Sequence, residues 1–353
     1  MNKKKILVIV GVIFILLTIG VSAATIMYTA NNVSYSSSTL SGNNVQSALE
    51  NLYNKYQSSS TTPPSGMTCT RKTNIKCRRA TTLHTEPCTS TDTNYKCQNA
   101  GYALNATITY GNQTTIEGVL TTGDAFDCDV NGDGTFNPST ERFYYVSDYY
   151  DTSTKNFNDK VAVLIYYSNV IGGEASSTGA AYALQADCQA VGTCTSSTGC
   201  NWYGPVTERS ELPKTSQWTN IRLYKDTRQI LAENNATSTS GGALPTIFSY
   251  SGYAARLLTF QEAYNGCNSF VKVPDSTGAG ALDAKCLFLL EGTQFSTEGA
   301  FTYGIWLESP SQLYSDIAYT VDGFTRNLVN THTNFKSYGA RPTIEILKSQ
   351  ILY

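Results

Sequence analysis

Runs of β-branched and aromatic residues mark the middle of the chain as β-structure. Residues 142–146 have the sequence Arg-Phe-Tyr-Tyr-Val and residues 161–167 have Val-Ala-Val-Leu-Ile-Tyr-Tyr, and Asp, Asn and Gly bound both runs. Such runs between turn-forming residues are typical of strands. After Gly304 the pattern predicts short strands and loops as far as Ile346.

Two later segments have the pattern of helices. Thr259 begins the sequence Thr-Phe-Gln-Glu, which predicts a capping box with Glu262 reaching back to the Thr259 amide. A second helix is expected from about residue 282 to residue 291, ended by Gly292. Cys267 follows the first helix and Cys286 lies in the second, so we expect a Cys267–Cys286 disulfide.

Residues 1–28 have the pattern of an export signal. Lysines precede an apolar run at residues 6–21, and Val21-Ser22-Ala23 offers small residues for cleavage after Ala23. The run comes close to the roughly 20 residues that span a bilayer, so a membrane anchor within residues 6–28 is the alternative. In both cases we expect the protein to be exported to the cell surface or beyond, with the membrane contacted only through this segment.

Residues 29–66 are expected to form a helical stalk and a linker. One apolar stripe recurs at helical spacing, at Val45, Ala48, Leu49, Leu52, Tyr53 and Tyr56. A stripe on so short a helix cannot hold it alone in water, so it must pack on the body or on copies of itself, as in a homotrimer. Residues 57–66 form a Ser/Thr/Pro linker.

Ten cysteines follow the export signal, an even number that predicts disulfides. The chain has no C-x-x-C and only two histidines, which argues against zinc. Residues 67–101 are expected to form a small cysteine-rich module. We favour the pairs Cys69–Cys77 and Cys88–Cys97 there, although four cysteines allow three connectivities. Residues 102–353 form the main domain, with an insertion near residues 172–204 that carries Cys188, Cys194 and Cys200.

Charge excludes one class of partner. Charged residues make up 15% of the chain and the net charge is −2. Nucleic-acid binding requires clustered lysine and arginine, and no such cluster occurs, so we expect no nucleic-acid partner.

The segment that begins at Asp129 has the spacing of a calcium loop. Oxygen-bearing side chains occupy the first, third, fifth and ninth positions, and glycine occupies the sixth. Thr140 stands at the twelfth position in place of an acidic residue, and Glu141 follows it. The predicted Ca²⁺ ligands, in a structural role, are Asp129, Asn131, Asp133, Thr135, Asn137 and Glu141. The alternative is an Asn/Asp/Gly turn without an ion.

Four motifs in the last hundred residues resemble one superfamily. They are Arg-Leu-Leu-Thr at residues 256–259, Tyr-Gly-Ile-Trp-Leu-Glu-Ser at 303–309, the strand and turn at 317–323, and Tyr-Gly-Ala-Arg-Pro at 338–342. Together they are similar to formylglycine-generating-type and related bacterial domains, and the chain resembles a Gram-positive bacterial surface protein with such a C-terminal domain. The resemblance implies an α+β, C-type-lectin-like fold with short strands and two helices.

In such folds Arg256, Arg341 and Trp306 are expected to have structural roles. The resemblance does not bring an enzyme, because formylglycine-generating enzymes use a late cysteine pair and no cysteine follows Cys286. A serine hydrolase would need a Gly-x-Ser-x-Gly near a histidine, and the chain lacks it. We therefore expect a protein that is not an enzyme.

Loops between residues 303 and 338 carry the recognition residues of related folds. Aromatic and amide side chains in this interval suit adaptable contacts. The expected binding residues are Tyr314, Asp316, Tyr319, Phe324, Arg326, Asn327, Asn330, His332, Asn334 and Phe335. The sequence thus predicts an exported, non-catalytic adhesion protein that binds an external glycan or protein. A self-assembling surface or fibre component, and an enzyme on the same scaffold, are the alternatives.

Overall fold

The computed structural model describes residues 74–88, 103, 105–113, 119–172, 179–267, 284–293, 304–323 and 327–353. They all belong to one compact unit, Lys72–Tyr353, which is separate from Met1–Arg71. The expected signal or anchor at 1–28 and the stalk and linker at 29–66 lie outside the described residues. Within the described ranges, every helix is too short or too polar to cross a membrane.

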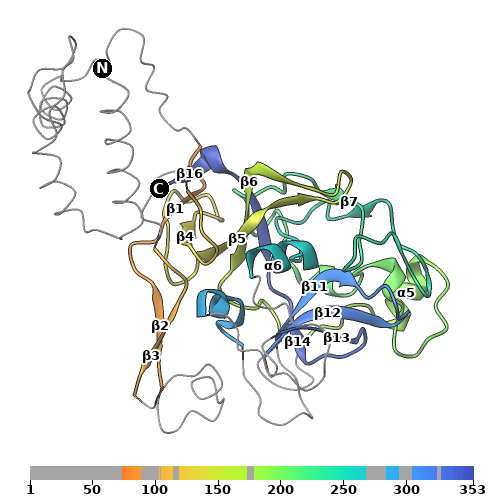
Figure 1. The fold of residues 1–353 in the computed structure, drawn as a ribbon. Helices are drawn as coiled ribbons and strands as arrows, with labels where there is room; N and C mark the ends of the chain where they lie inside the picture. The colour runs from red at the N-terminus through yellow and green to blue at the C-terminus, as the bar shows by residue number, and fades with distance from the viewer. Residues whose placement is uncertain are drawn as a thin grey trace, which may run out of the picture. The chain divides into compact units, whose positions relative to one another are not determined.

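A six-stranded sheet forms the centre of this unit (Figure 1). Its order is β15-β6-β5-β4-β1-β16, with all neighbours antiparallel except β1 and β16. The strands are β1 (Cys77–Arg79), β4 (Ala125–Cys128), β5 (Arg142–Asp151), β6 (Asn156–Tyr166), β15 (Thr343–Leu347) and β16 (Ile351–Leu352). The strand runs expected at 142–146 and 161–167 lie in β5 and at the end of β6, which confirms them.

Both faces of this sheet are buried, which explains the unbroken apolar runs. Tyr144 and Val163 belong to one hydrophobic cluster, whereas Phe143 and Leu164 belong to another. Successive side chains of a strand point to opposite faces, so a strand covered on both sides needs apolar residues at every position.

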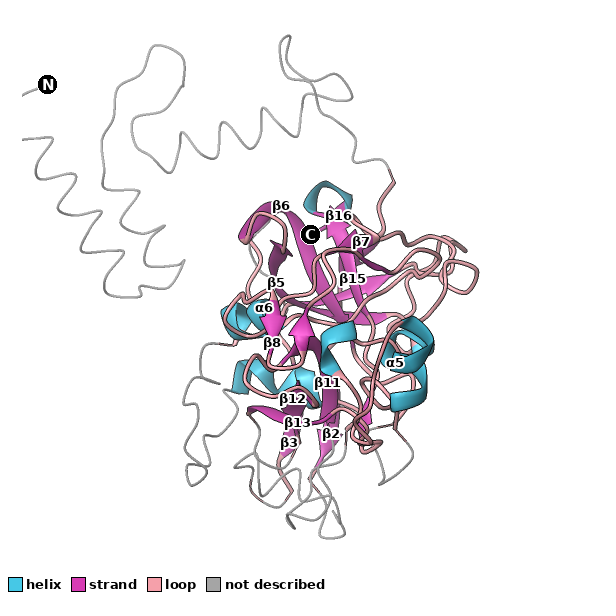
Figure 2. Cartoon of the chain, turned by 90° about the vertical axis from the view of Figure 1, so that its right-hand side faces the viewer, coloured by secondary structure: helices cyan, strands magenta, loops and turns pink. Residues whose placement is uncertain are grey.

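A second, four-stranded sheet has the order β13-β12-β11-β14. It contains β11 (Gly304–Pro310), β12 (Ile317–Asp322), β13 (Leu328–His332) and β14 (Tyr338–Gly339). Helix α6 (Phe260–Gly266) lies between the two sheets, where it contacts β5 and β11 (Figures 1 and 2). Ile305 and Val321 of the second sheet join the cluster that contains Tyr144. The two sheets therefore share one core.

Shorter elements complete the described part of the chain. Strand β2 (His84–Pro87) pairs with β3 (Thr107–Tyr110), and helix α5 (Gln185–Val191) lies in the segment expected as an insertion. Two further pairs are formed by β7 (Thr227–Arg228) with β10 (Phe248–Ser249), and by β8 (Ser238–Thr239) with β9 (Gly242–Ala243). The 3-10 segments are Asn201–Tyr203, Glu208–Glu211, Ala284–Leu290 and Lys348–Gln350.

The expected α+β, C-type-lectin-like class is wrong, because the unit is mostly β. The described residues contain sixteen strands but two α-helices, each of seven residues. The helix expected at 282–291 is a 3-10 segment, Ala284–Leu290. The capping box at Thr259 is present as predicted, with the Thr259 hydroxyl accepting from the Glu262 amide at 3.1 Å.

The disulfides correct the proposed cysteine-rich module. Cys77 is bonded to Cys128, so the predicted Cys69–Cys77 pair is wrong. The two residues lie opposite each other on the antiparallel strands β1 and β4, a contact that spacing along the chain cannot reveal. Strand β1, from the segment expected to form this module, belongs to the six-stranded sheet.

The other cysteines divide into bonded and free. The predicted Cys267–Cys286 disulfide is confirmed. Cys88 is also disulfide-bonded, whereas Cys69 and Cys97 lie outside the described residues. In the segment after α5, Cys194 is bonded to Cys200, and Cys188 is a free, buried thiol.

Candidate ligand-binding cleft

An open cleft of about 1030 Å³ lies where four segments of the chain meet. The turn between β5 and β6 and the loop at residues 233–235 form part of its lining. Helix α6 and the region from Leu313 to Tyr319 supply the rest. Binding sites for small ligands are concave regions of roughly 300–1,000 Å³, so the cleft has the size of such a site.

Aromatic rings from both sheets and from α6 line the cleft. Phe260 and Tyr264 are one helical turn apart on α6, and their rings stack with centroids 5.8 Å apart. Tyr319 of β12 meets Phe260 edge-on at 4.9 Å, and Phe157 of β6 lies 5.0 Å from Tyr150. Phe157 and Tyr264 are 41% and 40% exposed, so each offers a ring face to solvent.

Amide side chains lie among these rings. Asn156, Asn234 and Asn265 are exposed. Asn235 is held by the Tyr150 hydroxyl, which donates to its Oδ1 at 2.9 Å. Asn235 also has a φ of 59°, a left-handed conformation that asparagine tolerates in turns. The loop therefore presents its amides in a defined geometry.

Gln261 of α6 leaves one hydrogen-bonding group without a partner. Its Nε2 donates to the carbonyl of Ala232 at 2.9 Å, but its buried Oε1 accepts from no group. Buried polar atoms without a partner are rare in folded proteins, and they often have a functional explanation.

One lysine and one glutamate balance the charge of the cleft. Lys155 Nζ donates to the carbonyl of Asn235 at 2.9 Å, and Glu233 Oε2 accepts from the amide of Gln312 at 2.9 Å. Burial and the charge of Glu233 raise the pKa of Tyr319 to about 12, so this phenol stays protonated as a donor. Glu233 is the one carboxylate among the lining residues. A glycosidase ordinarily needs two.

Tyr319 is the one expected binding residue that lines the cleft. Asn330 lies opposite it on β13 and hydrogen-bonds its side chain. Asn327 sits at the start of β13, where its carbonyl accepts from the amide of Asp322 at 3.0 Å. Phe324 and Arg326 lie outside the described residues.

The remaining expected binding residues lie near the loop that follows α5, and several of them contact it. Asp316 accepts from the Thr198 hydroxyl at 2.6 Å and lies 3.1 Å from His332 Nδ1. The Asn334 amide reaches the carbonyl of Ser197 at 3.5 Å, and Phe335 packs on the His332 ring. Tyr314 is exposed. The structure thus divides the expected binding residues between the cleft and the loop that follows α5.

Most residues of the cleft cannot be identified from the sequence alone. The other lining residues of the cleft come from segments far apart in the chain, such as Asn156-Phe157, Glu233-Asn234-Asn235 and Tyr264-Asn265. An aromatic residue beside an asparagine in a turn or on an exposed helical position was the available signal. No pattern along the chain shows that these segments meet.

The loop at residues 129–141 has the internal hydrogen bonds of a calcium loop. The Asp129 carboxylate accepts from the amides of Gly132 at 2.7 Å and Gly134 at 3.1 Å. The Asn131 oxygen accepts from the Asp133 amide at 2.8 Å, and the Asp133 carboxylate accepts from the Thr135 amide at 2.7 Å. Hydrogen bonds within the loop therefore fix these three side chains, as they would in an ion-binding loop or in an Asn/Asp/Gly turn without an ion.

Glu141 lies at the C-terminal end of this loop and hydrogen-bonds back to its backbone. Its two carboxylate oxygens accept from the amides of Val130 at 3.3 Å and Asn137 at 2.9 Å. Burial raises the pKa of Glu141, and the charges of Asp129 and Asp133 raise it further. The loop therefore gathers negative charge that a cation would offset.

A buried network of charges lies outside the cleft. Arg256 donates to Glu262 at 2.7 Å and to Glu345 at 2.5 Å, and Arg228 lies 3.0 Å from Glu308. All five side chains are buried, so the arginines neutralise carboxylates of the fold rather than facing a substrate.

Arg341 and Trp306 also have the structural roles expected of them. Arg341 is buried and donates to backbone carbonyls, including that of Leu289 at 2.8 Å. The Trp306 ring is buried, and its nitrogen donates to the carbonyl of Ala180 at 2.8 Å.

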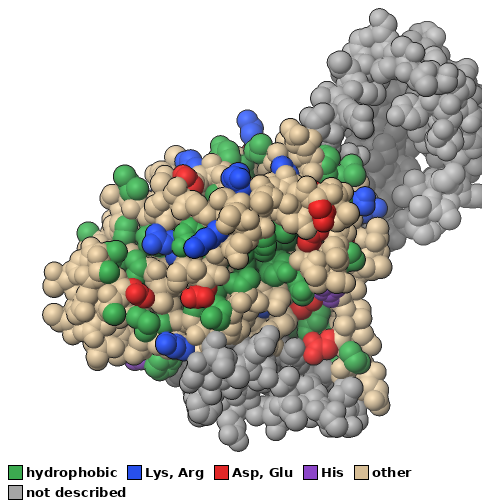
Figure 3. All heavy atoms as spheres, turned by 180° about the vertical axis from the view of Figure 1, so that it is seen from behind, with side chains coloured by type: hydrophobic (Ala, Val, Ile, Leu, Met, Phe, Trp, Pro, Cys, Tyr) green, Lys and Arg blue, Asp and Glu red, His purple; other side chains and the backbone are tan. Residues whose placement is uncertain are grey.

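Charged side chains are scattered on the face drawn in Figure 3, with no extended patch of one sign. Comparisons of the chain with protein-family models, with characterised proteins and with solved structures find no match. The function of the cleft therefore has to be inferred from its own geometry and chemistry.

Proposed function

We propose that the protein is exported and binds an external glycan, without catalysis, in the cleft lined by α6 and the β5–β6 turn. One observation carries the proposal: the exposed rings of Phe157 and Tyr264 share a cleft with exposed asparagine side chains. The export signal expected at residues 1–28 and the disulfides support a location outside the cytoplasm.

Sugars match this lining chemically. A pyranose ring has an apolar face of C–H groups, which packs on an aromatic ring, and a rim of hydroxyls that both donate and accept. Asparagine amides also donate and accept, so they pair with hydroxyls in either sense. Aromatic and amide side chains together are typical of adaptable binding surfaces.

The same lining supports binding without glycosidase chemistry. Glu233 has no second carboxylate beside it in the cleft, so the paired acid and base of glycosidases are missing among the lining residues. The buried carboxylates around Arg256 are shielded from solvent and cannot replace it.

Glycan-array binding by residues 24–353 tests the proposal. We expect a defined set of glycans to bind, and Phe157→Ala and Tyr264→Ala each to weaken the strongest of them about 10-fold, since loss of an aromatic contact costs about 1.4 kcal/mol. Tyr224→Ala is the matched control, because Tyr224 is 47% exposed but lies outside the cleft. Unchanged affinity in both cleft variants, or equal loss in the control, would contradict the proposal.

We also propose that the loop at residues 129–141 binds Ca²⁺ in a structural role. Calorimetry should show one Ca²⁺ per chain in the wild type, with a rise in melting temperature. Asp129→Ala should lose both effects, whereas Asp159→Ala, at an exposed position near the start of β6, should keep them. A wild-type protein that shows no heat of binding and no change in melting temperature in millimolar Ca²⁺ would refute this role.

A further inference from the structure

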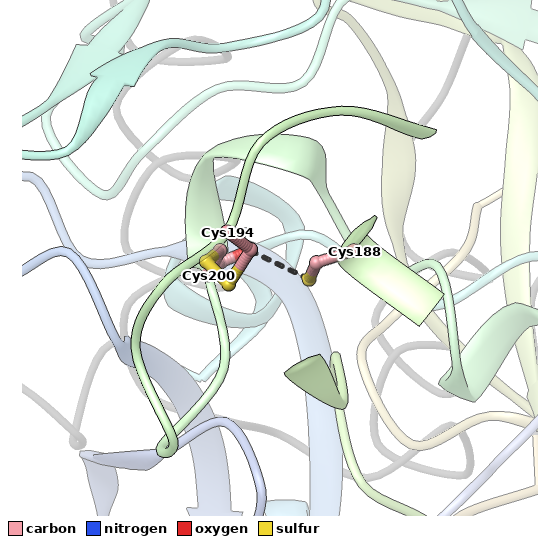
Figure 4. Close-up of side chains that lie close together, drawn as sticks. All are labelled: Cys188, Cys194 and Cys200. Atoms are coloured by element: carbon pink, nitrogen blue, oxygen red, sulfur yellow. Dashed lines mark hydrogen bonds between the residues drawn. A yellow bond between two sulfur atoms is a disulfide. The ribbon is translucent and has the colours of Figure 1, made fainter. Parts of the chain in front are cut away.

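Three sulfur atoms meet beneath the loop that follows α5. Cys188 comes from α5, and the Cys194–Cys200 disulfide closes the loop. All three Sγ atoms lie within 4.8 Å of one another and all three residues are buried. Figure 4 shows the Cys188 side chain pointing toward the disulfide-bonded pair.

We propose that these residues form an intramolecular thiol–disulfide exchange site, in which Cys188 displaces one partner of the Cys194–Cys200 disulfide. The Cys188 thiolate attacks one of the two bonded sulfurs, and a new bond to Cys188 forms as the old bond breaks. The displaced sulfur leaves as a thiolate and takes up the proton that Cys188 released. One disulfide and one thiol remain, so no oxidant or reductant is consumed.

Local hydrogen bonds hold the three sulfurs together. The Cys188 thiol donates to the carbonyl of Cys200 at 3.4 Å. Gln189, the next residue of α5, donates to the carbonyl of Cys194 at 2.8 Å. The helix is thus tied to both ends of the disulfide-closed loop, which keeps the attacking sulfur beside its targets.

Burial restricts the reaction to these three residues. An external thiol cannot reach sulfurs that are shielded from solvent, so the neighbouring cysteine is the available partner. Burial also raises the pKa of Cys188, a backbone hydrogen bond with Cys200 lowers it, and the charge of Asp187 raises it. Tyr182 is a further titratable group near Cys188, and it also interacts electrostatically with Glu208. The thiol is therefore protonated at neutral pH, and exchange accelerates as pH rises.

Exchange would change how the loop supports the second sheet. Thr198, inside the loop, donates to Asp316, and its carbonyl accepts from the Thr333 hydroxyl at 2.6 Å. Asn201, directly after Cys200, donates from its side chain to the carbonyls of Tyr314 at 2.6 Å and Ile317 at 2.7 Å. Moving the disulfide to Cys188 transfers this support from a closed loop to α5.

Disulfide mapping of three serine variants tests the proposal. Cys188→Ser, Cys194→Ser and Cys200→Ser each leave two of the three cysteines. After acid quenching, alkylation and peptide mass spectrometry, we expect the remaining two to be disulfide-bonded in every variant. The Cys267–Cys286 disulfide in the same digest is the internal control for correct folding.

The wild type supplies the second measurement, which does not depend on variant folding. On incubation at about pH 9, the Cys194–Cys200 fraction should fall while peptides linked through Cys188 appear. The Cys188→Ser variant should keep the Cys194–Cys200 bond under the same conditions. Cys188 that stays free in the wild type at high pH, or free thiols in both the Cys194→Ser and Cys200→Ser variants, would overturn the proposal.

Discussion

At the residue scale, Glu208 is the most unusual side chain of the described unit. It is fully buried, and neither carboxylate oxygen has a hydrogen-bond partner. An ionised carboxylate in such a place would be very costly. Burial, with a smaller effect from the charge of Glu211, raises the pKa of Glu208 well above its usual range. The carboxyl group therefore stays protonated in the folded protein at neutral pH.

This protonation should make stability depend on pH. The folded pKa lies above the unfolded value near 4.5, so folding takes up a proton and stability falls as pH rises above that value. Glu208→Gln lacks this titrating carboxyl group. Between pH 4 and pH 8, its free energy of unfolding should therefore rise relative to that of the wild type by on the order of 1–3 kcal/mol. Urea unfolding at both pH values measures this.

The exposed neighbour Glu211 provides the control. Glu211→Gln should follow the pH dependence of the wild type closely. The free energies of unfolding of wild type and Glu208→Gln could instead differ by the same amount at both pH values. That result would show that Glu208 has the same protonation state in the folded and unfolded chain.

At the scale of elements, His84 connects β2 to two other segments. Its Nδ1 lies 2.6 Å from Glu291, just after the Ala284–Leu290 segment, and its Nε2 lies 2.7 Å from the carbonyl of Pro138. A carbonyl only accepts and a carboxylate accepts when ionised, so both ring nitrogens donate. Burial lowers the pKa of His84, but the hydrogen bonds and charge of its partners outweigh this and raise it.

Deprotonation of His84 should weaken its contacts with Glu291 and with the carbonyl of Pro138. Because the pKa of His84 is raised in the folded state, its contribution to stability is complete below about pH 6.5 and is lost as pH rises through the folded value. His84→Asn should therefore cost about 1 kcal/mol at pH 6 and less at pH 9, measured by thermal unfolding. His332→Asn removes the other histidine and should leave this difference in place. A cost for His84→Asn that is independent of pH would contradict the assignment.

Elements with local signals could be predicted from the sequence. The capping box at Thr259, the apolar runs of β5 and β6, and the Cys267–Cys286 bond depend on residues close in the chain. The Cys77–Cys128 bond could not, because it follows from the pairing of β1 with β4 across 51 residues. The segment expected as a second helix is a 3-10 segment, and its apolar residues Leu287, Phe288, Leu289 and Leu290 are buried.

At the scale of the whole unit, non-local pairing decides the fold class. The central sheet joins β1 to β16 from opposite ends of the unit, and it joins β15 to β6, which lie far apart in the chain. The motif at residues 256–259 lies beside the end of the motif at 338–342, since Arg256 pairs through its backbone with Thr343, the residue directly after Pro342. Such contacts show proximity, but they do not show the strand order, and the α+β class inferred from the motifs was wrong for that reason.

Long-range packing also creates the cleft. Phe157, Asn235, Tyr264 and Tyr319 come from four segments whose meeting depends on both sheets and on α6. Of the loop residues expected to carry recognition, Tyr319 lies in the cleft. We therefore assign glycan binding to a place in the fold rather than to a motif.

Hydrogen–deuterium exchange with the strongest-binding glycan of the array tests that claim most directly. At saturation we predict slower amide exchange at residues 153–157, 233–235 and 260–265, the segments that line the cleft, and little change at residues 327–335. Protection confined to residues 327–335, with the cleft segments exchanging as in the free protein, would contradict binding in the cleft.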